Sequence, residues 1–345
     1  MEILITGGNG FLGRNLVLAL QERGDNIRVI ALPTEDTAWL EERNVKVFRG
    51  NIVDPHMLVE PMRGVDGVIH LAAMIGAWRA MKDYYVVNVT GTENVCRAAL
   101  KAGVHRLVHI SSAMVYDMAM GRPVTEDDPL KPLDEPYSWT KAQGDILVER
   151  MIREEHLPAV IVRPGTLVGP GDRLNFGRMA DRVRAGKGII IGSGNNAIPL
   201  VYITDLVQGL LLALDSEQAV GKIYNISNDL PLTQEQYLSI IAQEIGVAPP
   251  RIHVPYHLLY TAAYTAERIA VLSKDRILPF LTRHGVKLYG ANNLVSIDKA
   301  HRELGFSPKV PISEAVRIAC AWYLRPKDWT FGPMSGNILQ ETRAD

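Results

Sequence analysis

Short runs of β-branched and aliphatic residues alternate along this chain with amphipathic helical patterns. The strand-like runs cover residues 2–6, 27–31, 45–48, 67–72, 106–111 and 159–163, and helical patterns such as 83–102 and 137–156 lie between them. These runs are apolar at successive positions, so both faces of each strand are expected to be buried. The sequence therefore predicts an α/β fold in which helices cover both sides of a parallel sheet through right-handed crossovers.

The alternation changes after Arg163. A stretch rich in glycine and proline, RPGTLVGPGD, leads to a predicted helix near 173–186. The segment LVYITDLVQGLLLAL predicts a strand followed by a helix whose N-cap is Thr204 or Asp205. GKIYNIS predicts one more strand of the sheet, and residues 231–325 are mostly helical in pattern.

A glycine-rich loop follows the first strand and opens the first helix, in the segment LITGGNGFLGRNL. Gly7 allows a tight turn, Gly10 lets the backbone approach a pyrophosphate, and Gly13 allows the helix to pack closely on the strand. The helix N-terminus then faces the anion. A structural turn without a ligand is the alternative, but the strand before the loop and the helix after it favour a dinucleotide.

The end of the second strand leaves the choice between NAD and NADP open. An acidic residue there usually holds the ribose hydroxyls of NAD, but this chain has Ala31 followed by Leu32. No arginine stands there to hold a 2′-phosphate. Arg14 could reach such a phosphate, although a solvated charge is the simpler interpretation. The expected cofactor is therefore NAD or NADP.

The segment DEPYSWTKAQGD places Tyr137 four residues before Lys141 at the start of a predicted helix. Residues at this spacing share one helix face, so the phenol and the ammonium project together. A nearby ammonium favours the phenolate and lowers the tyrosine pKa, which suits proton exchange with a secondary alcohol. Ser112 follows the strand at 106–111, where a hydroxyl can donate to the substrate oxygen, although strand-end capping is the alternative role for Ser111 and Ser112.

Taken in order, the motifs TGGNGFLG, DGVIHLAA, NVTGT, SSAMVY, YSWTK and RPGTLVGPGD resemble those of the extended short-chain dehydrogenase/reductases. That family includes NAD-dependent epimerases and dehydratases and 3β-hydroxysteroid dehydrogenase-like enzymes, and the resemblance runs from residue 2 to about 325. It implies a Rossmann-type, doubly wound domain of residues 1–168 and about 198–229. It also implies a smaller, mostly helical substrate domain of about 169–197 and 230–325, followed by a tail at 326–345.

The resemblance further implies roles for individual residues. Its catalytic triad corresponds to Ser112, Tyr137 and Lys141. Cofactor-binding positions are expected at Gly7, Gly10, Phe11, Leu12, Gly13, Asn51, Ile52, Leu71, Ala72, Asn88, Tyr137, Lys141 and Pro164. Asn51 stands where the family usually has aspartate, and Asn88 could equally cap or pack its own helix. By analogy, helices 83–102 and 137–156 pair two subunits of a homodimer.

Two substrate classes compete. Nucleotide-sugar epimerases and dehydratases with tightly bound NAD hold the substrate diphosphate with arginines, but Ile198 and Thr166 occupy two positions where polar donors are usual. IGSGNNAIPLVYITDL and SIDKAHRELGFSPKV resemble the 3β-hydroxysteroid dehydrogenase-like branch instead. We therefore expect hydride transfer at a secondary alcohol or ketone of a hydrophobic, steroid-like or other substrate in an apolar cleft. Arg173, Arg178 and Arg182 could still bind phosphate, or form one solvated helix face.

Other classes of function are disfavoured. A protein that only senses redox state is expected to lack Tyr137 or Lys141, so the presence of both favours an enzyme. The formal net charge of −1 gives no basic surplus for nucleic acid or anionic membranes, and no apolar run approaches the length of a membrane span. We expect no signal peptide, because the first strand begins at Glu2.

The cysteines and histidines show no metal-binding pattern. Cys96 and Cys320 lie in helical patterns without CxxC spacing, which favours buried free thiols in a reducing compartment such as the cytoplasm. His70 and His109 lie inside strand runs and are expected in the core. His253, His257 and His284 are too dispersed for a metal site, so no metal is expected. Trp78, Tyr84 and Tyr85 could border the cleft or simply pack.

Overall fold

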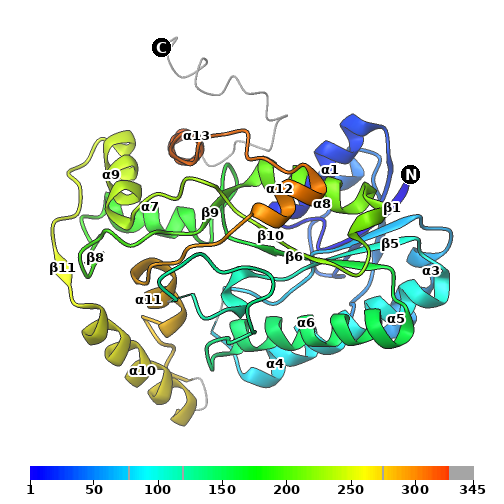
Figure 1. Ribbon diagram of the computed structural model, residues 1–345, viewed down its shortest axis with the longest axis horizontal. Helices are drawn as coiled ribbons and strands as arrows, with labels where there is room; N and C mark the ends of the chain where they lie inside the picture. The colour runs from blue at the N-terminus through cyan, green and yellow to red at the C-terminus, as the bar shows by residue number, and fades with distance from the viewer. Residues whose placement is uncertain (77, 119, 274–275, 326–345) are drawn as a thin grey trace.

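A seven-stranded sheet in which each neighbouring pair is parallel forms the centre of the computed structural model, which describes residues 1–76, 78–118, 120–273 and 276–325 (Figure 1). In spatial order the strands are β10 (Ile223–Ile226), β6 (Ala159–Pro164), β5 (Arg106–Ile110), β4 (Gly67–His70), β1 (Glu2–Thr6), β2 (Asn26–Ala31) and β3 (Lys46–Arg49). These are the strands predicted from the sequence, with small shifts at their ends. The predicted α/β fold is therefore confirmed, while the predicted tail at 326–345 lies outside the described residues.

The strand order reverses beside β1. The chain runs from β1 outward to β2 and β3, then returns to the other side of β1 to build β4, β5, β6 and β10. In open parallel sheets the ligand crevice lies at the carboxyl ends of the strands where the order reverses. This topology therefore points to the carboxyl ends of β1 and β4 as the place for a ligand.

Both faces of the sheet are covered by helices. Ile3 and Ile5 of β1 join one apolar core and Leu4 joins the other, since alternate side chains point to opposite faces. The first core includes α1 (Phe11–Arg23), α2 (Ala38–Glu41), α8 (Ile203–Asp215) and α12 (Asp298–Leu304). The second core includes η1 (Pro55–Leu58), α3 (Val59–Met62), α5 (Thr92–Ala102) and α6 (Pro136–Glu155).

Two helices that matter for the site have distinctive starts. The predicted helix 83–102 is a run of α4 (Met81–Tyr85), the π-helical segment η2 (Val86–Gly91) and α5. The predicted helix 137–156 is α6, with Pro136 in its first turn and the Glu135 side chain accepting from the Tyr137 and Ser138 N–H groups. Proline suits this position because its missing N–H would have no helical partner there.

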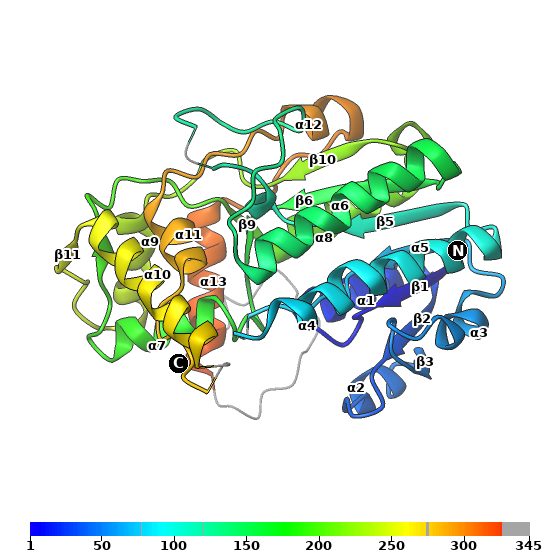
Figure 2. The same cartoon turned by 90° about the horizontal axis from the view of Figure 1, so that it is seen from below.

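A smaller, mostly helical part of the chain lies at one end of the large sheet (Figure 2). It contains the two-stranded sheets of β7 (Thr166–Val168) with β9 (Leu200–Tyr202) and of β8 (Ile190–Ile191) with β11 (His253–Val254). Its helices are α7 (Phe176–Arg184), α9 (Gln234–Ile245), α10 (Tyr256–Leu272), α11 (Arg283–Gly290) and α13 (Ile312–Leu324). Short turns η3 (Ala113–Val115) and η4 (Glu217–Ala219) complete the chain. The domain boundaries given above stay predictions.

The start of α8 corrects one expectation. Thr204 or Asp205 was predicted as its N-cap, but the helix begins at Ile203 with Tyr202 as N-cap. Asp205 lies in the first turn, and its carboxylate accepts from the backbone N–H groups of Lys309 and Val310 at 3.0 and 3.4 Å. The Asp205 carboxylate therefore binds backbone N–H groups more than a hundred residues away instead of capping its own helix.

Buried polar residues behave largely as expected. His70 accepts or donates at Thr6 Oγ1 (2.7 Å) and Thr92 Oγ1 (3.0 Å), and its ring centroid lies 5.5 Å from that of His109 in the core. Cys96 and Cys320 are buried free thiols.

None of the helices formed by the described residues is long and apolar enough to cross a bilayer.

Candidate active site

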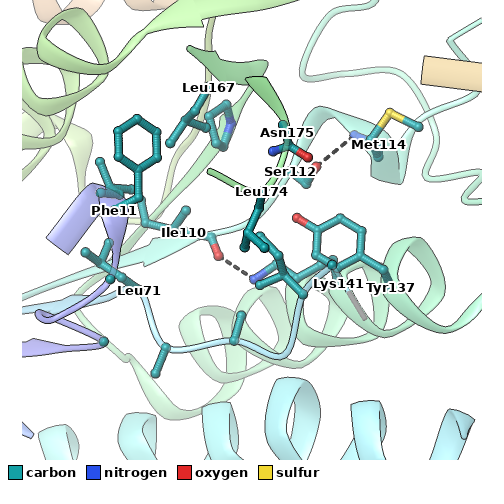
Figure 3. A pocket seen from close by; sticks show the side chains of 18 of the residues that line it. Phe11, Leu71, Ile110, Ser112, Met114, Tyr137, Lys141, Leu167, Leu174 and Asn175 are labelled. Atoms are coloured by element: carbon teal, nitrogen blue, oxygen red, sulfur yellow. Dashed lines mark hydrogen bonds between the residues drawn. The ribbon is translucent and has the colours of Figure 1, made fainter. Parts of the chain in front are cut away.

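A cavity of about 840 Å³ lies at the carboxyl ends of the central strands. It is lined by every predicted site residue except Asn88: Gly7, Gly10, Phe11, Leu12, Gly13, Asn51, Ile52, Leu71, Ala72, Ser112, Tyr137, Lys141 and Pro164. These residues come from segments spread over half the chain, and Figure 3 shows several of their side chains converging on one space. The fold therefore brings the sequence-predicted positions together.

The glycine-rich loop forms one wall of the cavity. Gly7 has a φ of +73°, and a Cβ there would lie 2.9 Å from the Ala72 nitrogen. A Cβ on Gly13 would lie 2.3 Å from the Gly7 carbonyl oxygen, so α1 can approach β1 closely only with glycine. Gly10 caps α1 without a side-chain hydrogen bond, which leaves the helix N-terminus to an anion. The loop fits the pyrophosphate of a dinucleotide.

The far end of the cavity contains an acidic residue that the sequence analysis missed. Glu35 lines the cavity together with Leu32, Asn51 and Ile52. A turn brings Glu35 back toward the end of β2. The Glu35 N–H donates to the Leu32 carbonyl at 3.0 Å, and the Arg49 guanidinium donates to the Glu35 carbonyl at 2.6 Å. The acid four residues after Ala31 was visible in the sequence, but the turn that returns it to the cavity was not.

Arg14 is not a solvated charge, contrary to the sequence-based interpretation. Its Nε donates to the Asn9 carbonyl at 3.0 Å, and its guanidinium lies 5.1 Å from the centroid of the Trp39 ring. Burial lowers its pKa, although nearby Asp36 opposes this effect. Arg14 is also outside the set of residues that line the cavity.

Tyr137 and Ser112 meet at the centre of the site. Burial raises the Tyr137 pKa above its ordinary value, a hydrogen bond with Ser112 pulls the pKa down, and the charge of Glu135 raises it again. Ser112 Oγ also accepts from the Met114 N–H at 3.2 Å, so it both caps η3 and contacts the phenol. Ser112 therefore caps η3 and contacts the phenol, while its donation to a substrate oxygen stays a prediction.

Lys141 does not lower the tyrosine pKa as the spacing suggested. Its Nζ donates to the Ile110 carbonyl oxygen at 2.5 Å, as Figure 3 shows, and burial dominates the ionisation of the phenol. Burial also lowers the Lys141 pKa to about 8, with Asp145 acting in the opposite direction. A lysine this close to neutrality can lose or keep its proton within the working range of most enzymes.

Asn88 lies behind the cavity rather than in its wall. Its amide oxygen accepts from the Met74 N–H at 2.7 Å, and its amide nitrogen donates to the Met74 carbonyl and to Thr140 Oγ1. These bonds tie the loop after β4 to α6. The structure thus gives Asn88 a bracing role, and its contact with a cofactor stays a prediction.

The other residues of the cavity wall are mostly apolar but include cations. Apolar lining residues include Phe11, Ile75, Trp78, Tyr84, Leu167, Leu174 and Leu288. Arg79, Arg173 and Arg178 also line it and are exposed, whereas Arg182 and the buried Ile198 are outside the lining set. The cleft is therefore not walled by apolar groups alone, which corrects part of the expectation from the sequence. Tyr85 packs against Trp139, with ring centroids 6.2 Å apart.

His284 of α11 is a second residue that the sequence analysis passed over. It lines the cavity, and its ring meets the Tyr137 ring edge-on with centroids 5.4 Å apart. Sequence spacing gave no signal, because the contact joins positions 137 and 284. Among the described residues, no group of three or more histidine, cysteine, aspartate or glutamate side chains could hold a metal ion.

A Rossmann-type sheet, a glycine-rich loop at a helix N-terminus and a Ser–Tyr–Lys set in one cavity define a dinucleotide-dependent enzyme of the short-chain dehydrogenase type. A family model described as "NAD dependent epimerase/dehydratase family" matches residues 3–227. The chain belongs to this family, whose members are NAD-dependent dehydrogenases, reductases and epimerases.

Three similar proteins indicate the breadth of the family. A 2-alkyl-3-oxoalkanoate reductase of Stenotrophomonas maltophilia is 32% identical over 92% of this chain and 98% of its own length. The mouse sterol-4-alpha-carboxylate 3-dehydrogenase, decarboxylating, is 30% identical over 90% of this chain and 88% of its own length. DesIV, a dTDP-glucose 4,6-dehydratase of Streptomyces venezuelae solved with NAD bound, superimposes with a TM-score of 0.76 at 26% identity, covering 94% of this chain and 97% of that one.

Proposed function

We propose that this enzyme interconverts a secondary alcohol and a ketone on a largely hydrophobic substrate, with NAD or NADP as redox partner. The observation that carries the proposal is the Tyr137 phenol, which is hydrogen-bonded to Ser112 beside a mostly apolar cleft. The relatives named as acting on 2-alkyl-3-oxoalkanoates and sterol carboxylates support the same class of substrate.

In the reductive direction, Ser112 and Tyr137 both donate to the substrate carbonyl oxygen. The carbonyl carbon gains a hydride, and the oxygen takes the Tyr137 proton, so that an alcohol forms; oxidation reverses each transfer. A bound nicotinamide dinucleotide supplies or accepts the hydride. Lys141, which lines the cavity beside Tyr137, would hold the ribose of the bound cofactor. The raised Tyr137 pKa suits a proton donor, because the phenol stays protonated until the substrate oxygen develops charge.

The test measures turnover of 2-alkyl-3-hydroxyacid esters and other apolar secondary alcohols by nicotinamide absorbance, with Tyr137→Phe as the inactive reference. Oxidation by wild type and loss of oxidation in the variant are expected. Turnover that is the same in both proteins would refute the role of Tyr137.

A nucleotide-sugar epimerase or dehydratase is the second candidate, and the three arginines in the cavity wall favour it. Arg79, Arg173 and Arg178 could pair with a diphosphate, as arginine forks often do. All three are exposed, which argues against a preformed diphosphate site. Two of them also have other contacts: the Arg173 guanidinium lies 5.9 Å from the centroid of the Trp322 ring, and Arg178 donates to the Gly76 carbonyl. Binding of nucleoside diphosphates to the dinucleotide-loaded protein separates the two candidates.

The proposed assembly is a homodimer through the helical segments 83–102 and 137–156. Tyr85, Val86 and Ile146 lie on these segments and expose 42%, 42% and 49% of their surfaces, which a four-helix interface would cover. Light scattering of wild type and Ile146→Asp measures the assembly. We also propose a cytoplasmic location, supported by two buried thiols that form no disulfide.

A further inference from the structure

His284 lies beside the reacting centre but has no part in the proton transfer described above. It belongs to the first turn of α11, and its imidazole contacts the Tyr137 ring edge-on at 5.4 Å between centroids. Its side chain is 26% exposed and lines the cavity. The smaller part of the chain therefore places an imidazole in direct contact with the Tyr137 ring.

One nitrogen of this imidazole is already held. Nδ1 lies 3.3 Å from Glu135 Oε1 and 3.4 Å from Ser138 Oγ, both at the start of α6. Glu135 is fixed in turn, because its carboxylate accepts from the Tyr137 and Ser138 N–H groups at 2.9 and 2.7 Å. Burial raises the Glu135 pKa, but hydrogen bonding to His284 and its charge outweigh burial and bring the pKa below its ordinary value.

The pairing with Glu135 determines what the other nitrogen can bind. A carboxylate at Nδ1 accepts the Nδ1 proton and orients the ring, and in the imidazolium form Nε2 carries a proton as well. Since Nδ1 contacts Glu135 and Ser138 and the residue lines the cavity, Nε2 is the nitrogen left for a ligand. A charged N–H donor in a partly buried site suits a carboxylate acceptor.

Position selects where that carboxylate belongs on the substrate. In the proposed reaction the substrate oxygen binds Ser112 and Tyr137, so a group that also reaches His284 must sit only a few bonds from the reacting carbon. Arg79, Arg173 and Arg178 also line the cavity, but they are exposed, and a solvent-screened arginine binds a carboxylate more weakly than a partly buried donor does.

We propose that His284 binds a carboxylate carried on the carbon next to the reacting carbon, so that the preferred substrate is a hydrophobic 3-hydroxy or 3-oxo acid. This inference rests on the proposed alcohol–ketone chemistry. The names of the two relatives above describe such compounds, a 3-oxoalkanoate and a sterol 4-carboxylate oxidised at its neighbouring carbon.

The experiment compares a 2-alkyl-3-hydroxyacid with its methyl ester, which has the same apolar body and no charge. We expect wild type to have at least a tenfold lower KM for the acid. In His284→Asn, KM for the acid should rise at least tenfold while kcat changes less than threefold, and the ester should be little affected. His257→Asn, an exposed histidine on α10, is the matched control and should match wild type.

Binding of the acid and the ester to the cofactor-loaded wild type, measured by calorimetry, gives an answer that needs neither turnover nor a folded variant. At least tenfold tighter binding of the acid supports the proposal. Equal binding of acid and ester, or an equal loss for both substrates in His284→Asn, overturns it. Retention of the acid preference in His284→Asn with its loss in Arg178→Gln would also overturn it, because the carboxylate would then lie among the exposed arginines. Turnover of the ester that depends on Tyr137 would leave the alcohol–ketone chemistry standing in each of these cases.

Discussion

Replacement of Lys141 by methionine should stabilise the folded protein at neutral pH while removing activity. The Lys141 side chain is buried, and burial lowers its pKa from 10.5 to about 8. At 1.36 kcal/mol per pKa unit, holding this lysine charged costs the fold about 3 kcal/mol at pH 7. Methionine fills a similar volume without charge. It also removes the hydrogen bond to the Ile110 carbonyl, worth about 1 kcal/mol. The net expected gain is about 2 kcal/mol in the free energy of unfolding.

The gain should disappear as the pH rises. The folded protein releases the Lys141 proton near pH 8, whereas the unfolded chain holds it to about 10.5. Between these values the unfolded state binds more protons, so the stability of wild type rises with pH relative to that of the variant. At pH 10 the burial cost has fallen to about 1 kcal/mol, which the lost hydrogen bond offsets.

Urea unfolding of the cofactor-free protein, followed by tryptophan fluorescence at pH 7 and pH 10, measures both quantities. Lys101→Met, at an exposed position near the end of α5, is the control and should change stability by less than about 0.5 kcal/mol. A Lys141→Met protein that is less stable than wild type at pH 7, or equally stabilised at both pH values, would show that burial does not strain this lysine. Dinucleotide titration of the same variant should show weaker binding, and turnover should be lost.

Three further outcomes are expected. Tyr137→Phe should lower turnover at least about a hundredfold while dinucleotide binding survives, as measured by steady-state kinetics and fluorescence titration, because the ring stays and the proton carrier is removed. NAD should be favoured over NADP by less than roughly a hundredfold, because Glu35 lines the cavity on a turn and the end of β2 itself has no charged residue for the ribose. A preference of several thousandfold on titration of both dinucleotides would mean that a contact has been missed. UDP and other nucleoside diphosphates should fail to bind the dinucleotide-loaded protein with micromolar affinity in calorimetry; such affinity would favour the nucleotide-sugar epimerase and identify Arg173 and Arg178 as the diphosphate site.

The sheet and the cofactor loop could be predicted because their signals are local. Runs of apolar residues, a glycine at each required position and a helical pattern after the loop specify β1, the turn and α1 within a single stretch of chain. The Tyr137–Lys141 spacing likewise needs only the geometry of one helix, and the structure keeps both residues in the cavity. The sequence analysis did not distinguish the π-helical segment η2, since it is short and lies within a continuous helical run from α4 to α5.

By itself, the sequence determined the order of strands and helices, the family and the set of residues gathered at the carboxyl ends of the strands. Only the tertiary structure decided the pKa values of those residues and which distant residues they contact. Burial, which no short segment encodes, raises the pKa of Tyr137 and lowers that of Lys141. The turn that returns Glu35 to the cavity, and the pairing of His284 with Glu135 across nearly 150 positions, likewise depend on segments meeting in space. Periodicity describes what a segment does with its own neighbours, and these contacts form only when the whole chain has packed.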